Sequence, residues 1–273
     1  MHAAVVTTFG QSPAFAEFPD PIASKGEIVV EVLASAIHPR VRSQADGSHY
    51  TSTDELPLVP GIDGVGRTAE GELRYFVLPD TTLGAMAERT LIDPRRSIRL
   101  PDDVDPVLIA AAMNPAMSSW NALRRRIDFA PDSRVLIMGA TAAQVVWPTH
   151  HRRGRDAAKL AALLPLGADV VIDLSVAPDE QLTWVQIGSI AGRDAAIPSA
   201  ALRATRLQIV GSGQGSVSTR DILAELPELA LELSRGDYKI GARVVPLSDI
   251  TAAWAEAAVT DDRLVVVPRA TRD

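Results

Sequence analysis

Cysteine is absent from this chain of 273 residues. Disulfide bonds, thiolate zinc sites and a cysteine nucleophile are therefore excluded, and any metal would need His and carboxylate ligands. Long apolar runs are also absent, since none approaches the roughly 20 residues of a membrane-spanning helix. No basic segment precedes an apolar core near Met1, as it would in a secretory signal. We therefore expect a cytoplasmic protein.

An excess of positive charge is missing as well. The chain has 27 Lys and Arg against 34 Asp and Glu, which gives a net charge of −7. This balance argues against nucleic acid as a partner. Two local basic runs, at 124–126 and 150–153, are expected to be solvated helix ends. With 47% hydrophobic residues, the chain can bury a substantial core and is long enough for two modest domains.

Two kinds of sequence pattern succeed one another. Residues 1 to about 100 are rich in Pro and Gly, and their short apolar segments predict β-barrel-like packing. From 105 onward, strand-like and helix-like segments alternate, which predicts a parallel sheet. The expected strands are 3–7, 27–33, 86–92, 135–138, 169–174, 183–188, 207–211 and 264–268. The expected helices are 107–113, 118–126 after a break at Pro115, 156–164, and a segment from Thr219 toward Leu233.

The segment 134–141 is typical of a dinucleotide site. An apolar strand ends in Gly139, Ala140 and Thr141, where backbone N–H groups can approach a diphosphate. The glycines that should follow are missing. Ala142 and the residues after it occupy their positions and leave the phosphates less room. The sequence therefore predicts a cofactor site with an altered phosphate turn.

Further cofactor contacts are predicted after later strands. Arg155 and Lys159 follow the second strand, where a cation can pair with the ribose phosphate that distinguishes NADP from NAD. The alternative is that both are the exposed face of the helix 156–164. The remaining predicted cofactor-binding residues follow two later strands: Gly188, Ser189, Gly211 and Ser212.

Several segments, taken in order, resemble one known family. They are 26–32, 37–43 with 47–50, the run P-L-V-P-G-I-D-G-V-G at 57–66, 166–169, and 245–254. Together they are similar to zinc-independent medium-chain dehydrogenases/reductases of the quinone oxidoreductase branch. The resemblance implies an α/β protein with a GroES-like, β-barrel-type substrate domain at 1–105 and 236–273. Between these parts it implies a Rossmann-type, doubly wound nucleotide domain at 106–235, apparently shortened.

The same resemblance implies NADPH as cofactor, hydride transfer to a quinone or enone, and a homodimer. Zinc-using relatives place metal ligands at positions that correspond to His38, Ile62 and Asp63. Ile62 cannot bind a metal, so no zinc site is expected. His38 either donates a hydrogen bond to a substrate oxygen or packs against its loop. Tyr50 either lines the substrate cleft or anchors the loop.

Residues 114–120 resemble the family's helix start that contacts the nicotinamide. Ser118 is accordingly a candidate catalytic residue, although simple N-capping would explain it equally. Trp120 is expected in the core. The strand 207–211 resembles the edge strand through which such dimers extend their sheets.

The nucleotide domain looks too short. Between 174 and 183 only eight residues are available, whereas a crossover between parallel strands needs a dozen or more. The segment 140–153 is also short and contains Pro148. We therefore predict a chain break or an unusual topology at 174–183. Two functions stay open at this point: an NADPH-dependent reductase, and a non-catalytic or cofactor-impaired relative that acts as a dimeric binding or scaffold protein.

Overall fold

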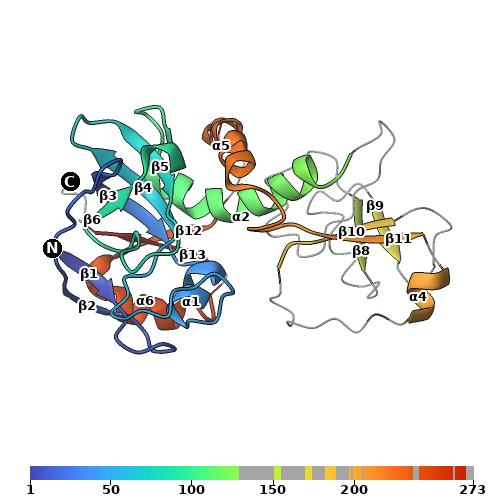
Figure 1. Ribbon diagram of the computed structural model, residues 1–273, viewed down its shortest axis with the longest axis horizontal. Helices are drawn as coiled ribbons and strands as arrows, with labels where there is room; N and C mark the ends of the chain where they lie inside the picture. Colours follow the sequence, from blue (N-terminus) through green and yellow to red (C-terminus); the bar gives the residue numbers. More distant parts are fainter. Residues whose placement is uncertain are drawn as a thin grey trace. The chain divides into compact units, whose positions relative to one another are not determined.

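The computed structural model divides the chain into two compact units (Figure 1). It describes residues 1–128, 151–154, 170–173, 182–188, 197, 199–204, 206–235, 240–260 and 262–268. Unit 1 comprises Met1–Asn114 and Leu226–Asp273, and unit 2 comprises Pro115–Glu225. The second unit is therefore inserted in the sequence of the first.

Unit 1 is built on a seven-stranded sheet, and a separate two-stranded hairpin precedes the first strand of this sheet in the sequence. The sheet order is β12-β13-β3-β4-β5-β7, and β6 also pairs with β3. Its strands are β3 (Ile28–Ala36), β4 (Asp63–Thr68), β5 (Leu73–Val77), β6 (Arg89–Ile92), β7 (Ser97–Arg99), β12 (Ala242–Pro246) and β13 (Arg263–Val267). The hairpin pairs β1 (His2–Val5) with β2 (Ala14–Glu17).

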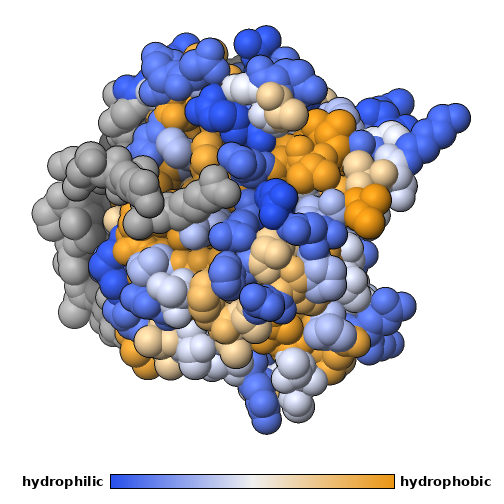
Figure 2. All heavy atoms as spheres, turned by 90° about the vertical axis from the view of Figure 1, so that its left-hand side faces the viewer, coloured by the Kyte–Doolittle hydropathy of each residue, from blue (hydrophilic) through white to orange (hydrophobic). Residues whose placement is uncertain are grey.

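Two short α-helices and two 3-10 helices complete the periphery of unit 1. They are α1 (Pro39–Ala45), η1 (Pro94–Arg96), η4 (Leu247–Asp249) and α6 (Ile250–Glu256). Pro39 begins α1 because its fixed φ suits the first helical turn. Apolar and polar groups are intermixed on the face seen in Figure 2, as on most protein surfaces.

The C-terminal strands complete the core that the N-terminal strands begin. β13 pairs antiparallel with β3, with Val265 opposite Ala36, and β12 pairs parallel with β13. One buried apolar cluster combines residues from both ends of the chain. Its larger members are Ile37, Val41, Leu58, Met86, Leu247, Ile250, Trp254 and Leu264. Burial of these side chains is the main force that holds the two ends together.

Gly61 enters β4 in a conformation that other residues rarely adopt. Its φ is +115°, and a Cβ added there would lie 2.7 Å from the backbone N of Ala85. The Gly61 carbonyl accepts a hydrogen bond from that same nitrogen. Only glycine allows this close backbone approach, which sets the segment that leads to Asp63.

Helix α2 (Pro106–Arg125) corrects two expectations from the sequence. Pro115 lies inside one continuous helix instead of ending it, and Ser118 therefore lies in the helix interior and is not an N-cap. The helix continues through the proline because apolar residues on both sides are buried, including Met113, Ala116 and Trp120. That burial offsets the hydrogen bond that proline cannot donate.

Unit 2 contains parallel strand pairs, as the alternating pattern predicts. β8 (His151–Gly154) pairs with β9 (Val170–Asp173), and β10 (Leu182–Gln186) pairs with β11 (Leu207–Gly211). Among its described residues the helices are the second half of α2, α4 (Ser199–Ala204) and the start of α5 (Thr219–Ser234). Residues 151–153 thus belong to a strand, which corrects their interpretation as a helix end, because strand pairing takes up their backbone groups.

The two segments of the nucleotide domain that look too short in the sequence lie largely outside the described residues. Within the described strands, β9 pairs with β8 and β10 pairs with β11, and no pairing joins β9 to β10. The connection at 174–181, where a break or an unusual topology is predicted, and the short turn at 142–149 are not among the residues described. Across the ranges that the structure does describe, no helix has the length and apolar character to cross a membrane.

Candidate functional site

A buried hydrogen-bonded group of three side chains lies at the end of β3 and the start of β4. His38 directly precedes α1, Asp63 begins β4, and Tyr75 lies on the neighbouring strand β5. Asp63 Oδ1 lies 2.9 Å from His38 Nε2, and Asp63 Oδ2 accepts a 2.8 Å hydrogen bond from the Tyr75 hydroxyl. At most 2% of each side chain is exposed. One carboxylate therefore fixes both rings.

The chemistry of the group assigns its protons. A carboxylate only accepts hydrogen bonds, so His38 Nε2 carries the proton that it shares with Asp63. Burial, and then the negative charge of Asp63, raise the pKa of Tyr75 well above its usual value. Tyr75 is therefore a neutral donor near pH 7. His38 Nδ1 is buried and has no hydrogen-bond partner among the described residues.

This arrangement does not suit zinc at the three positions that zinc-using relatives occupy. His38 and Asp63 bind one another, and Ile62 packs in the apolar cluster. Within the part of the chain that the structure describes, no group of three His, Asp or Glu side chains is placed to hold a metal. The group is instead suited to hydrogen bonding.

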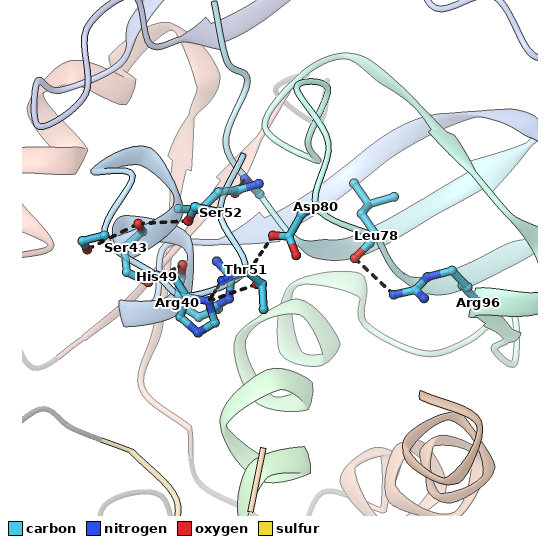
Figure 3. Close-up of polar contacts among 11 residues, drawn as sticks. Arg40, Ser43, His49, Thr51, Ser52, Leu78, Asp80 and Arg96 are labelled. Atoms are coloured by element: carbon cyan, nitrogen blue, oxygen red, sulfur yellow. Dashed lines mark hydrogen bonds and ion pairs between the residues drawn. The ribbon is translucent and has the colours of Figure 1, made fainter. Parts of the chain in front are cut away.

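A second polar cluster in unit 1 surrounds Arg40, as Figure 3 shows. Arg40 Nη2 donates to Asp80 Oδ1 and to Thr51 Oγ1, each at 2.7 Å. The Thr51 hydroxyl lies 3.0 Å from His49 Nδ1, which also accepts the Thr51 backbone N–H at 3.2 Å. Burial and the neighbouring Arg40 charge lower the pKa of His49. A neutral His49 thus accepts at Nδ1.

Tyr50 lies beside this cluster. Its side chain is 72% exposed, and its ring stacks on His49 with the centroids 4.2 Å apart. The structure therefore places Tyr50 on an accessible loop next to Arg40 and His49, not in the core. Whether it lines a substrate cleft stays a prediction.

In unit 2, one buried carboxylate ties α2 to α5. Glu225 Oε2 accepts from Trp120 Nε1 at 2.7 Å and from Arg124 Nε at 2.6 Å, while Oε1 pairs with Arg125 at 2.7 Å. Trp120 is buried, as expected from the sequence. The basic run 124–126 is not simply solvated, because ion pairing with Glu225 engages its first two members. Ser118 lies on the same helix, and its catalytic role stays a prediction.

The predicted cofactor residues are partly described. Gly188 follows β10, Gly211 ends β11, and the Ser212 backbone N–H donates to the Gln186 carbonyl at 2.9 Å. The carboxyl ends of these parallel strands therefore meet, which is where nucleotides bind in such sheets. An added Cβ at Gly188 or Gly211 would meet nothing within 4 Å. Gly139, Ala140, Thr141, Arg155, Lys159 and Ser189 lie outside the described residues.

Arg126 supports the loop that follows β11. Its Nε donates to the Gly211 carbonyl at 2.7 Å, and its Nη1 lies 3.4 Å from the Ser216 carbonyl. The end of α2 thus holds the backbone next to two predicted cofactor residues.

Sequence reasoning missed three of these groups: Tyr75, the Arg40–Asp80 pair and Glu225. The apolar character of β5 would have placed Tyr75 inside, but not against Asp63. Arg40 and Asp80 are 40 positions apart, and Trp120 and Glu225 are 105 apart. Such contacts depend on tertiary structure that one sequence does not reveal.

Comparison with known proteins gives a consistent picture. A protein of Emericella nidulans named "Probable NADPH-dependent quinone reductase" is 27% identical, over 98% of this chain and 100% of its own length. Among solved structures, the quinone oxidoreductase of Thermus thermophilus has a TM-score of 0.73 at 23% identity, covering 98% of this chain and 100% of that one. An alcohol dehydrogenase of Pyrobaculum aerophilum reaches 0.78 at 18% identity, covering 98% and 99%. No protein-family model matches the sequence.

The length of that alignment bears on the predicted shortage. It extends over 356 positions, whereas this chain has 273 residues. The Emericella relative therefore contains many residues that have no counterpart here.

Proposed function

We propose that this chain, a zinc-independent medium-chain dehydrogenase/reductase of the quinone oxidoreductase-like branch, is an NADPH-dependent reductase of quinones or activated alkenes. The observation that carries the proposal is the alignment with the Emericella protein along nearly the whole chain. The GroES-like and Rossmann-type fold that the sequence predicts is the fold of the similar solved structures.

NADPH, when bound, supplies the hydride. The described residues fit a nucleotide at the carboxyl ends of β10 and β11, where Gly188 and Gly211 leave the backbone open and Ser212 adds a polar side chain. We propose that Arg155 and Lys159 hold the ribose phosphate. Gly139, Ala140, Thr141 and Ser189 complete the proposed set by contacts to the diphosphate and nicotinamide ribose.

On the substrate side, we propose that His38 contributes a hydrogen bond through Nδ1. Asp63 and Tyr75 fix its ring, and Nδ1 is the buried nitrogen that no described group bonds. With the Nε2 proton shared with Asp63, Nδ1 of the neutral ring accepts, so a hydroxyl such as that of the hydroquinone product is its suitable partner. Tyr50 provides an aromatic surface for a flat quinone ring, and Ser118 is proposed as a further contact.

Two measurements test the proposal. NADPH binding is titrated by its fluorescence, and NADPH oxidation is then followed with simple quinones and enones. Binding and turnover support the reductase, whereas binding without turnover on any of these acceptors contradicts it. The variant Arg155→Glu is expected to lose the preference for NADPH over NADH, with Arg95→Glu as a control. An unchanged preference excludes the phosphate role of Arg155.

A cofactor-impaired scaffold protein is the second candidate. It is favoured by the number of aligned positions that this chain lacks and by the altered turn at Ala142 and Ala143. This candidate predicts no binding at millimolar NADPH, so the same titration separates the two functions.

We also propose a homodimer formed through β11. Within the described strands β11 pairs with β10 alone, and an open strand edge favours pairing with a second copy. Light scattering of the purified chain tests this, and a monomer at micromolar concentration excludes it.

A further inference from the structure

The loop 46–57, which follows α1, is fixed mainly by polar contacts. None of its residues is buried, so apolar packing contributes little to its stability. The carbonyl of Ser43, in α1, accepts the backbone N–H groups of Ser48 at 3.0 Å and of His49 at 3.3 Å. A segment held in this way can open locally at a low cost in free energy, without unfolding of the sheet.

The imidazole ring of His49 is the centre of a second set of contacts. Its Nδ1 accepts the Thr51 backbone N–H at 3.2 Å, and the Thr51 hydroxyl oxygen lies 3.0 Å from the same nitrogen. That oxygen also accepts from Arg40 Nη2, which Asp80 fixes from the segment after β5 (Figure 3). The exposed ring of Tyr50 stacks on the imidazole. One ring therefore connects the loop to α1 and to the segment after β5.

This geometry requires a neutral imidazole. Nδ1 can accept a hydrogen bond only while it carries no proton, so the proton of the neutral ring is on Nε2. After protonation both ring nitrogens are donors, and an Nδ1–H of His49 would point at the Thr51 N–H. The charged ring would also be repelled by Arg40, and the opposing attraction of Asp80 is weaker. The protonated form of His49 therefore does not fit the observed contacts.

We propose that His49 is a pH-sensitive latch for the loop 46–57: the neutral ring holds the loop in the observed conformation, and protonation releases the loop together with Tyr50. Protons can reach the ring because His49 is only partly buried. All of the contacts involved lie within unit 1. The inference goes beyond the proposed reductase activity and does not depend on it.

The direction of the pH effect follows from the two states of the loop. In the released loop His49 has its ordinary pKa of about 6.5. In the observed conformation burial, and then the charge of Arg40, lower the pKa of His49, while Asp80 opposes the shift. The latched state therefore binds fewer protons. Its stabilisation is complete above about pH 6.5 and is lost as the pH falls toward the lower value.

The test measures backbone motion in the full-length protein by NMR relaxation of the amides, at about pH 7.5 and about pH 5, the range in which histidine changes its charge. Order parameters of residues 48–55 are expected to fall from about 0.85 to below about 0.6 at the acidic pH. Strands β3 and β4 are the internal reference and should keep their values. Isotope-labelled histidine gives the protonation midpoint of His49, which should coincide with the loss of order.

Three variants separate protonation of His49 from other effects of acid. Asparagine at this position can accept the Thr51 N–H through its side-chain oxygen but cannot be protonated, so His49→Asn should keep the loop rigid at both pH values. His49→Ala has no acceptor and should leave the loop mobile at both. His2→Asn is the matched control, because His2 also stacks on an aromatic ring, that of Phe15, at 4.8 Å and lies 3.6 Å from Glu88. It should retain the full pH response.

Three results would overturn the inference. Unchanged order of residues 48–55 at acidic pH, while the His49 ring becomes protonated, excludes the latch. A pH response in His49→Asn equal to that of the unaltered protein assigns the effect to another group. An equal loss of order in β3 and β4 indicates general unfolding instead of release of one loop. Thermal unfolding curves at both pH values verify that each variant is folded, and NADPH and quinones are absent from every sample, so the outcome is independent of the proposed reductase.

Discussion

Tyr75 and Asp63 are joined across the neighbouring strands β4 and β5 by a hydrogen bond of 2.8 Å between the phenol oxygen and Oδ2. Both side chains are buried. Because Asp63 also holds His38, this single bond supports the ring that we propose for substrate binding.

Replacement of Tyr75 by Phe preserves the ring but leaves Asp63 Oδ2 without its donor. We expect a loss of about 1–3 kcal/mol in the free energy of unfolding, measured by urea denaturation. Tyr50→Phe removes a hydroxyl from a side chain that is 72% exposed and should change stability by less than about 0.5 kcal/mol. Equal effects of the two substitutions would contradict the importance of the buried bond.

Stability should fall at alkaline pH because of Tyr75. Its folded-state pKa is raised by burial and by Asp63, so above about pH 10 the unfolded chain loses the proton first. The stabilising contribution is complete below that pH and decreases as the pH rises toward the folded-state value. Unfolding free energies measured from neutral to alkaline pH should decline less steeply in Tyr75→Phe, and parallel curves would exclude this explanation.

Gly61→Ala should destabilise unit 1 strongly. The new Cβ would lie 2.7 Å from the Ala85 backbone nitrogen at a φ of +115°, which we expect to cost about 3 kcal/mol or more. Gly71→Ala is the matched control, because Gly71 also has a positive φ of 88° but open space around it. A smaller loss of about 1 kcal/mol is expected there. If the two variants unfold at the same urea concentration, steric contact is not the cause.

Glu225→Gln should weaken the contacts that join α2 to α5. Loss of the charge weakens the hydrogen bonds from Trp120 and Arg124, and we expect a cost of about 2 kcal/mol. Trp fluorescence should report the change, because the indole loses a charged acceptor. Glu232→Gln, which removes an ion pair with the exposed Arg235, should cost no more than about 0.5 kcal/mol. An unchanged emission spectrum in Glu225→Gln would argue against the described contact.

The fold can be predicted from the sequence because the patterns that indicate strands and domains are local. Alternating apolar segments predict the strands around β3 and β11, and the ordered family segments predict two domains. The predicted helix break at Pro115 is wrong because proline disfavours a helix interior locally, whereas the buried residues on both sides of it stabilise one continuous helix. Tertiary packing decided the outcome there.

The residues of the candidate site can be predicted only in part from the sequence. His38 and Tyr50 follow from the resemblance of one loop, but the partner of His38 does not. Asp63 was considered as a metal position, and its bond to Tyr75 depends on the register of β4 against β5. That Arg40 Nε and Nη1 have no partner among the described residues is known only from the structure, which shows the acceptors around the guanidinium.

The pairing of β13 with β3 has a consequence for the biosynthesis of this protein. The ribosome makes β3 before unit 2, yet Val265, which pairs with Ala36, is made only after unit 2. Unit 1 therefore cannot finish folding on the ribosome while unit 2 is being translated, and Ser35 and Ala36 at the end of β3 wait for β13 throughout, although β4 and β6 already pair with the rest of the strand. A premature stop codon before Arg263 would leave this end of β3 and the strand β12 without β13, so a truncation that removes β13 should yield an aggregating product.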